Sequence, residues 1–334
     1  MTIKDLASQT GYSVGTVSRV LNNQPHVSEQ AREVILKAAA ESGFQLNTNA
    51  KQLKQQHGTS ILVICKGTSN ELFDTLLVAI QARVAQTNYP LIVDYIDESE
   101  NEVRRAIQLC LEKKPLGILF LSGNQEHFLA DFHQITVPCV LVTNSAANLT
   151  FPNLSSVTSD DILAARCAID QLIRLGHREI AVIGGHRTYS DTTRFRYQGC
   201  LEAFAVHQIP FDEDRSYETA RFTFDDGYRA AAVLLQRNPA MTALFAMSDV
   251  MAIGAIRAMA DAGKRVPEDI SVIGLDGLPI GEYMVPRLST VAQSSEELAT
   301  QALELLRRSI EGEVAPRHEV LPVKLLLKES AKHI

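Results

Sequence analysis

The chain has 334 residues, enough for two or three domains, and 46% of them are hydrophobic, which is typical of a folded protein with a sizeable core. Its net charge of −7 does not indicate a nucleic-acid-binding protein, but the charge is unevenly spread. Residues 1–60 carry six Lys or Arg and four Asp or Glu, a balance of +2, whereas the rest of the chain carries −9. This pattern suits a protein that contacts DNA with one end only.

Membrane, secreted and metal-binding classes find no support in the sequence. The longest apolar runs, such as residues 116–121, have the length of a strand, and the first residues lack the apolar stretch of a signal peptide. The five cysteines are widely spaced without a C-x-x-C pair, so we expect buried free thiols in a reducing cytoplasm. The nine histidines show no metal-ligand spacing. We therefore expect a cytoplasmic protein that needs no metal.

Residues 2–23, TIKDLASQTGYSVGTVSRVLNN, predict two short helices around a tight turn at Gly11. Thr2 can cap the first helix and Ser13 the second. Small or hydrogen-bonding side chains and one arginine occupy the face of the second helix opposite its apolar residues: Val14, Gly15, Thr16, Ser18, Arg19 and Asn22. Such a helix fits the DNA major groove with its first side chains toward the base edges. Periodicity alone equally allows an ordinary amphipathic helix pair.

A third helix is expected to begin after Ser28 and to end at Gly43. Its expected apolar face consists of Ala31, Val34, Ile35, Ala38 and Ala39. The runs TIKDLA, GYSVGTVSRVLNN, VSEQAREVI and AAAESGF resemble the amino terminus of the LacI/GalR family of bacterial transcription repressors, and the likeness continues to the end of the chain. The resemblance implies a helix–turn–helix DNA-binding domain over residues 1–46, a hinge over 47–59 and an effector-binding core over 60–334.

Residues 47–59, NTNAKQLKQQHGT, are polar and on composition alone indicate a linker. The resemblance implies a short hinge helix that includes Ala50, Leu53 and Lys54, with Leu53 as an apolar wedge. About eight residues cannot hold a helix in water, so we expect this segment to become helical only in the DNA minor groove, paired with its copy from a dimer. The family usually has proline before the asparagine of the hinge, where this chain has Leu46.

From Ser60 onward, apolar strands alternate with amphipathic helices, which predicts parallel sheets covered on both faces and divided between two lobes. The expected strands are Ile61–Cys65, Leu91–Tyr95, Gly117–Leu121, Cys139–Val142, Ile180–Ile183, Ala243–Ala246 and Ser271–Ile273. The expected helices are Leu72–Gln86, Glu102–Leu111, Ile162–Leu175, Gly227–Leu235, Val250–Ala262 and Ser295–Ile310. The resemblance implies a core like periplasmic sugar-binding proteins, with lobe one at residues 60–158 and 291–318 and lobe two at 159–290 and 319–334.

Doubly wound sheets also occur in enzymes, but the sequence lacks their motifs. Neither a G-x-G-x-x-G loop nor a Walker loop follows a strand, and there is no G-x-S-x-G or H-E-x-x-H. His177 follows Gly176 at a helix end, where a capping or turn role is favoured over that of a catalytic base. We therefore expect neither an enzyme nor a cofactor.

In open α/β sheets, ligands bind beyond the carboxyl ends of the strands, which in this sequence are polar and include Lys66, Ser122 and Thr143. The resemblance implies further effector-binding residues. Arg196 matches the arginine that grips a ligand oxygen, and Asp276 matches the acid that accepts ligand hydroxyls. Phe73 and Phe222 match aromatic side chains that form walls of the family's ligand cleft. Ser248 and Asp249 match a pair of residues at a strand end beside the ligand, and Gln293 matches a glutamine where the chain crosses between the lobes.

The effector expected from these residues is a sugar or a sugar phosphate. Thr143 stands where the first lobe commonly has an aspartate, and Lys66 and Arg221 add positive charge nearby, which favours an anionic effector. The predicted function is a repressor whose affinity for a pseudo-palindromic operator is set by this effector. No leucine heptads follow Leu327, so we expect a homodimer. A solute-binding protein without a DNA role, or a regulator that responds to a purine or nucleoside, remain as alternatives.

Overall fold

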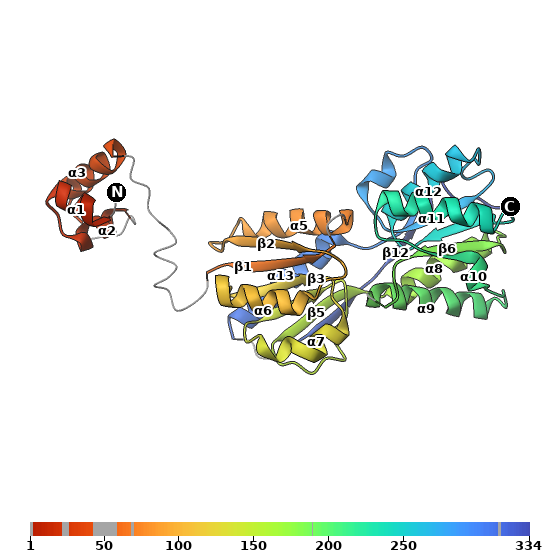
Figure 1. Cartoon of the computed structure of the whole chain (residues 1–334), viewed down its shortest axis with the longest axis horizontal. Coiled ribbons are helices and arrows are strands. Elements are labelled where there is room, and N and C mark those ends of the chain that lie inside the picture. Colours follow the sequence, from red (N-terminus) through yellow and green to blue (C-terminus); the bar gives the residue numbers. More distant parts are fainter. Residues whose placement is uncertain (1–2, 22–26, 43–58, 68–69, 189, 313–314) are drawn as a thin grey trace. The chain divides into compact units, whose positions relative to one another are not determined.

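The computed structural model describes residues 3–21, 27–42, 59–67, 70–188, 190–312 and 315–334. The chain forms two compact units, Met1–Gly58 and Thr59–Ile334, which we call the head and the core (Figure 1). Several residues with predicted DNA-binding roles lie outside the described residues: Thr2, Asn22, Ala50, Leu53 and Lys54. Their roles stay predictions.

The head contains the three predicted helices, α1 (Ile3–Thr10), α2 (Val14–Leu21) and α3 (Glu29–Glu41). The predicted turn at Gly11 is confirmed, because its φ of 72° is a conformation that glycine adopts without strain. The expected caps of α2 and α3 are also present, whereas the cap expected at Thr2 lies outside the described residues. The Ser13 hydroxyl accepts the Thr16 N–H at 3.1 Å, and the Ser28 hydroxyl accepts the Ala31 N–H at 3.3 Å.

A small apolar cluster holds the three helices of the head together. Its buried members are Leu6, Ala7, Val17, Val20, Ala31, Ile35 and Ala39. The prediction that Val34 shares this face was wrong, because its side chain is 42% exposed. The buried residues of α3 recur every four positions, because the short helices α1 and α2 cover only a narrow stripe of its surface.

The core contains two six-stranded sheets. The first has the strand order β11-β5-β4-β3-β1-β2 and is parallel throughout. Its strands are β1 (Ile61–Lys66), β2 (Leu91–Ile96), β3 (Gly117–Leu121), β4 (Cys139–Val142), β5 (Leu154–Ser159) and β11 (His318–Leu321). The second has the order β12-β10-β9-β8-β6-β7, and only β12 runs antiparallel to its neighbour. Its strands are β6 (Ile180–Gly184), β7 (Tyr217–Thr219), β8 (Ala243–Ala246), β9 (Ser271–Asp276), β10 (Ser289–Ala292) and β12 (Lys324–Leu326).

Helices cover both faces of each sheet, as the continuous apolar strands predict. In lobe one, alternate residues of β1 enter two different apolar clusters, with Val63 on the face of α5 and α13 and Leu62 on the face of α6 and α7. The helices of this lobe are α5 (Glu71–Val84), α6 (Glu102–Lys113), α7 (Gln125–Asp131) and α13 (Ser295–Ile310). A 3-10 turn, η1 (Phe132–Gln134), follows α7.

In lobe two, α8 pairs with α9 on one face of the sheet and α11 pairs with α12 on the other (Figure 1). The helices are α8 (Asp161–Arg174), α9 (Asp191–Val206), α10 (Glu213–Ser216), α11 (Phe224–Arg237) and α12 (Asp249–Asp261), with a 3-10 turn η2 (Pro279–Glu282). Gly254 allows α12 to approach α11 closely, since a Cβ there would lie 2.0 Å from the carbonyl oxygen of Phe224.

All seven predicted strands and all six predicted core helices are present, with ends that differ by a few residues. The chain crosses between the lobes three times, from β5 to α8, from β10 to α13 and from β11 to β12. The crossover limits expected at residues 290/291 and 318/319 therefore fall inside β10 and β11, because each of these strands pairs along its length with one sheet. None of the described helices has the length and apolar character needed to cross a membrane.

Candidate functional site

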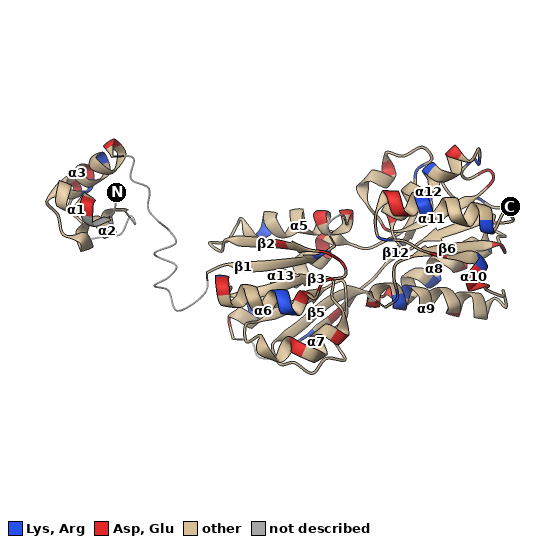
Figure 2. Cartoon of the chain, viewed as in Figure 1, with Lys and Arg blue, Asp and Glu red and all other residues tan. Residues whose placement is uncertain are grey.

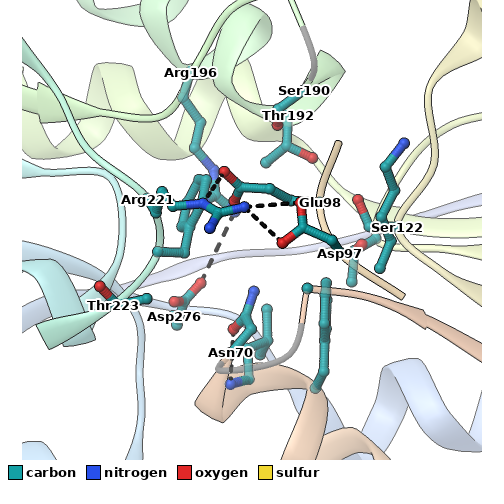
Figure 3. Close-up of a pocket in the computed structure, with 16 residues that line it drawn as sticks. Asn70, Asp97, Glu98, Ser122, Ser190, Thr192, Arg196, Arg221, Thr223 and Asp276 are labelled. Carbon is teal, nitrogen blue, oxygen red and sulfur yellow. Dashed lines mark hydrogen bonds and ion pairs between the residues drawn. The ribbon is translucent and has the colours of Figure 1, made fainter. Parts of the chain in front are cut away.

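A cavity lies between the two lobes at the carboxyl ends of the strands (Figure 3). In both sheets the strand order reverses beside the first strand of the lobe, and such a switch point is where open α/β sheets bind ligands. Seven of the ten residues predicted to bind effector line the cavity: Lys66, Phe73, Ser122, Thr143, Arg196, Phe222 and Asp276. The other lining residues are Gly67, Asn70, Leu72, Asp97, Glu98, Ser190, Thr192, Arg221 and Thr223.

Backbone strain is concentrated at the strand ends that face the cavity. Five described residues other than glycine have a positive φ, and three of these line the cavity, Ser122 at 69°, Thr143 at 72° and Asp276 at 130°. A β-branched residue such as Thr143 is rare in this region of φ. Because strained residues persist only where the surroundings hold them in place, these positions mark a pre-organised site.

Arg196 on α9 is the buried centre of the lobe-two wall, with 3% of its surface exposed. Its Nε donates to Asp161 Oδ1 at 2.8 Å, its Nη1 donates to the carbonyl of Met247, and its Nη2 lies 3.9 Å from Asp276 Oδ1. The guanidinium is thus fixed on three sides by the protein. Its planar fork is held in one orientation at the cavity, as recognition of ligand oxygens requires.

Asp276 ends β9 and is itself held by Gln293. The Gln293 side-chain amide donates to Asp276 Oδ1 at 2.9 Å, and its backbone N–H donates to the Asp276 carbonyl at 3.0 Å. Burial raises the pKa of the Asp276 carboxyl, and the charge of Arg196 opposes that rise. Gln293, predicted to bind effector, does not line the cavity and instead orients the acid that does.

Ser248 and Asp249 also lie outside the cavity lining, although they were predicted to bind effector. The Ser248 hydroxyl caps α12 by accepting the Met251 N–H at 3.3 Å. The Asp249 carboxylate accepts the backbone N–H of Gly277 at 2.8 Å and the Thr290 hydroxyl at 2.6 Å. Both side chains are therefore engaged in holding the loop after β9 and the start of α12.

Lys66 and Arg221, which were expected to add positive charge near the site, both line the cavity, but each is paired with an acid. Lys66 Nζ lies 2.6 Å from Glu102 Oε2. Arg221 contacts two carboxylates, with Nη2 at 2.8 Å from Asp97 and Nε at 2.5 Å from Glu98 (Figure 3). Each cation that favoured an anionic effector thus has an acidic partner, and these acids had not been assigned to the site.

Asp97 and Glu98 could have been found from the sequence, because they lie just beyond the predicted strand Leu91–Tyr95 and directly follow the observed strand β2, so they satisfy the strand-end rule. Ser190 and Thr192 carried no comparable signal. They lie at the start of α9, which was not predicted because its buried face includes polar residues such as Asp191 and Arg196 while Leu201 is exposed, which blurs its periodicity.

The lobes are joined at the cavity by side chains from opposite sides. The Gln125 N–H of lobe one donates to Asp191 at 2.8 Å, and the Asn144 amide donates to Thr192 at 3.0 Å. Arg221 adds a third connection at the solvent-facing rim, where its side chain is 50% exposed. A hydrogen bond from Ser99 together with Arg221 lowers the pKa of Asp97 to about 2, so this connection remains charged at neutral pH.

Replacing Arg221 with alanine is expected to loosen the lobes with little loss of overall stability, since exposed ion pairs contribute about 0–1 kcal/mol. Hydrogen exchange followed by mass spectrometry should show faster exchange in residues 122–126 and 190–193, which carry the other two interlobe contacts. The control is Arg229→Ala, which removes an exposed arginine paired only within α11. Equal exchange in both variants would contradict the bridging role of Arg221.

In the head, α2 presents a face free of acidic side chains. Val14 is 42% exposed, Gly15 and Arg19 are exposed, and Thr16 and Ser18 are partly buried. Val17 and Val20 point into the apolar cluster on the opposite side. Along the rest of the described chain, Lys and Arg residues are interspersed with Asp and Glu residues (Figure 2). The predicted contact residues of α2 within the described part therefore share one surface.

Comparison with known proteins explains why such a head accompanies such a core. Residues 2–47 match the family described as bacterial regulatory proteins, lacI family, and residues 169–331 match a periplasmic binding protein-like domain. The HTH-type transcriptional regulator MalR of Clostridium butyricum is 32% identical over 337 residues, with complete coverage of both chains. The chain belongs to the LacI family. A member of this family is a ligand-controlled DNA-binding repressor and not an enzyme.

Solved structures of LacI-family proteins cover the same two units. The transcriptional regulator CelR in complex with cellobiose has a TM-score of 0.71 and 28% identity, with 99% of each chain covered. The lac repressor dimer bound to operator and an anti-inducer has a TM-score of 0.80 and 25% identity, also over 99% of each chain. The similar structures thus include one protein in complex with cellobiose and one bound to operator DNA.

Proposed function

We propose that this LacI-family protein is a cytoplasmic homodimeric repressor whose operator affinity is set by a neutral sugar bound in the interlobe cavity. Residues 1–46 would read the operator, residues 47–59 would act as the hinge, and the two lobes would close on the sugar. Two heads on one dimer call for a pseudo-palindromic operator, because each head contacts one half-site.

The charge balance of the cavity carries the proposal of a neutral ligand. The lining residues include three cations, Lys66, Arg196 and Arg221; Arg221 is paired with Asp97 and Glu98, and Arg196 lies beside Asp276, a carboxyl whose pKa is raised by burial. Two more buried acids, Glu102 and Asp161, contact Lys66 and Arg196 from behind. A phosphate group would meet no unpaired cation among the described lining residues, whereas sugar hydroxyls can both donate to the acids and accept from the bases.

The aromatic side chains of the lining support a ring-shaped ligand. Phe73 of α5 and Phe222 beyond β7 belong to opposite lobes, and both are at least partly buried. A sugar ring presents apolar C–H faces between its hydroxyls, so it can pack against such rings while the polar groups bind its edge. A purine nucleoside could use the same rings, and it is therefore included as a competing ligand in the test.

DNA contact is proposed for the face of α2. Val14 and Arg19 would reach base edges, and Thr16 and Ser18 would contact phosphates. Gly15 contributes no side chain, so the helix would read few bases directly. Effector and operator would then alter each other's affinity by the same factor, because both bind one protein with coupled conformations.

A gel-shift assay with the DNA upstream of the gene, combined with calorimetry, tests the proposal. Ribose, cellobiose and glucose would each be compared with a phosphorylated form, and adenosine would serve as the nucleoside. We expect one neutral sugar to bind and to change operator affinity, with its phosphorylated partner at least about tenfold weaker. A phosphorylated sugar or adenosine that binds more tightly and shifts operator affinity would overturn the assignment of a neutral sugar.

A further inference from the structure

Lys66 reaches the cavity as one half of a buried ion pair. It is the last residue of β1, its side chain is 4% exposed, and its Nζ lies 2.6 Å from Glu102 Oε2. Glu102 does not line the cavity and has no exposed surface. It occupies the first turn of α6, where the amino end of the helix favours a carboxylate.

Glu102 is fully engaged by groups of lobe one. Its Oε1 accepts the backbone N–H of Asn124 at 2.7 Å, and its Oε2 lies 2.9 Å from His127 Nδ1. Burial opposes ionisation, but the hydrogen bond with His127 and the charge of Lys66 together lower the pKa of Glu102. The carboxylate is therefore charged at neutral pH, and it cancels the charge of Lys66 before any ligand arrives.

This cancellation decides what Lys66 can offer a ligand. An ammonium group has three donors, and the contact with Glu102 uses one of them. The other two can donate to hydroxyl oxygens, which need no net charge from the protein. An anion placed against Lys66 would be attracted by the ammonium and repelled by the carboxylate behind it, so the repulsion offsets part of the attraction.

We propose that Glu102 is a positioning residue that determines the charge class of the effector, by holding Lys66 as a neutralised hydrogen-bond donor. This inference rests on the proposed function of the cavity, and it adds a specificity role for a residue outside the cavity lining. Without the Glu102 carboxylate, the positive charge of Lys66 would no longer be offset, and Lys66 would bind anions instead of donating hydrogen bonds to neutral hydroxyl groups.

The full chain is compared with Glu102→Gln, Lys66→Met and the double variant, with inorganic phosphate as the probe. Calorimetry gives the affinity for phosphate. For each variant, the difference between the unfolding temperatures in phosphate and in chloride at equal ionic strength shows how much phosphate stabilises the protein. We expect Glu102→Gln to bind phosphate at least about tenfold more tightly than wild type, because the charge of Lys66 is no longer offset. Adding Lys66→Met should abolish that gain.

Glu304→Gln serves as the matched control, because it removes a carboxylate of the same kind from the exposed surface of α13. Phosphate affinity should remain at the wild-type level in this variant. A gain in Glu102→Gln that survives Lys66→Met would overturn the inference. The inference would also be overturned if the wild-type protein bound phosphate saturably and Lys66→Met removed that binding. Lys66 would then bind an anion while Glu102 is still present. Operator binding by the same preparations reports separately on the proposed function.

Discussion

Replacing Arg196 with methionine is expected to lower the free energy of unfolding of the core by about 3–5 kcal/mol and to abolish the response to effector. The guanidinium is buried and lies 2.8 Å from Asp161 and 3.9 Å from Asp276. Without it, two buried carboxyls lose their cation, and the Met247 carbonyl loses a donor. Denaturant unfolding followed by circular dichroism gives the loss. Arg166→Met, at an exposed i,i+4 pair on α8, is the control and should change stability by less than about 1 kcal/mol.

The loss in Arg196→Met should depend on pH in a defined direction. Burial raises the pKa of both Asp161 and Asp276, and Arg196 opposes the rise at each. Removing Arg196 therefore raises both pKa values further above the unfolded value of about 3.9. A carboxyl of this kind contributes stability below its unfolded pKa and loses it as pH rises through the folded pKa. The variant should be less destabilised at pH 5 than at pH 8.

A second substitution separates stability from ligand binding. Asp161→Asn in the Arg196→Met background removes one of the unpaired carboxyls, so it should restore part of the lost stability but none of the effector response. Arg196→Lys keeps the charge without the planar fork and should retain more stability than it retains affinity. A loss below 1 kcal/mol in Arg196→Met at pH 8 would contradict the role assigned to this network.

The parts of the fold that follow from local pattern were predictable. Strands such as Gly117–Leu121 are continuous apolar runs, and α2 and α3 of the head have capping residues at their starts. β5 was missed because its sequence, LSSVTS, is mostly hydroxyl residues, although all six residues are buried. The Ser156 hydroxyl bonds the Ala146 N–H and His318, so the structure satisfies polar groups that the sequence suggests are exposed.

The residues of the cavity were predictable one by one, but their partners were not. The sequence placed Lys66 at a strand end and Arg221 near the site. Their acidic partners are far away along the chain, since Glu102 is 36 residues from Lys66 and Asp97 is 124 residues from Arg221. No periodicity connects positions so far apart. The sign of the electrostatic environment, and with it the class of ligand, therefore depends on pairings that only the folded structure reveals.

The protein that lacks residues 1–58 is expected to lose operator binding completely and to keep effector binding. The head is a compact unit with its own apolar cluster, and the core has both lobes that form the cavity. A filter-binding or gel-shift titration of the intact and truncated proteins measures the loss. Calorimetry with the effector checks that the truncated core is intact.

A point variant tests the same separation without removing the head. Val17 of α2 has no exposed surface, so Val17→Asn would bury an amide in the apolar cluster of a very small unit, which has little stability to lose. We expect at least a hundredfold loss of operator affinity with unchanged effector binding. Val34→Asn, the same change at a side chain that is 42% exposed, should have little effect. If the truncated core bound operator as well as the intact chain, DNA recognition would have to be placed in the lobes, and the face of α2 would have another role.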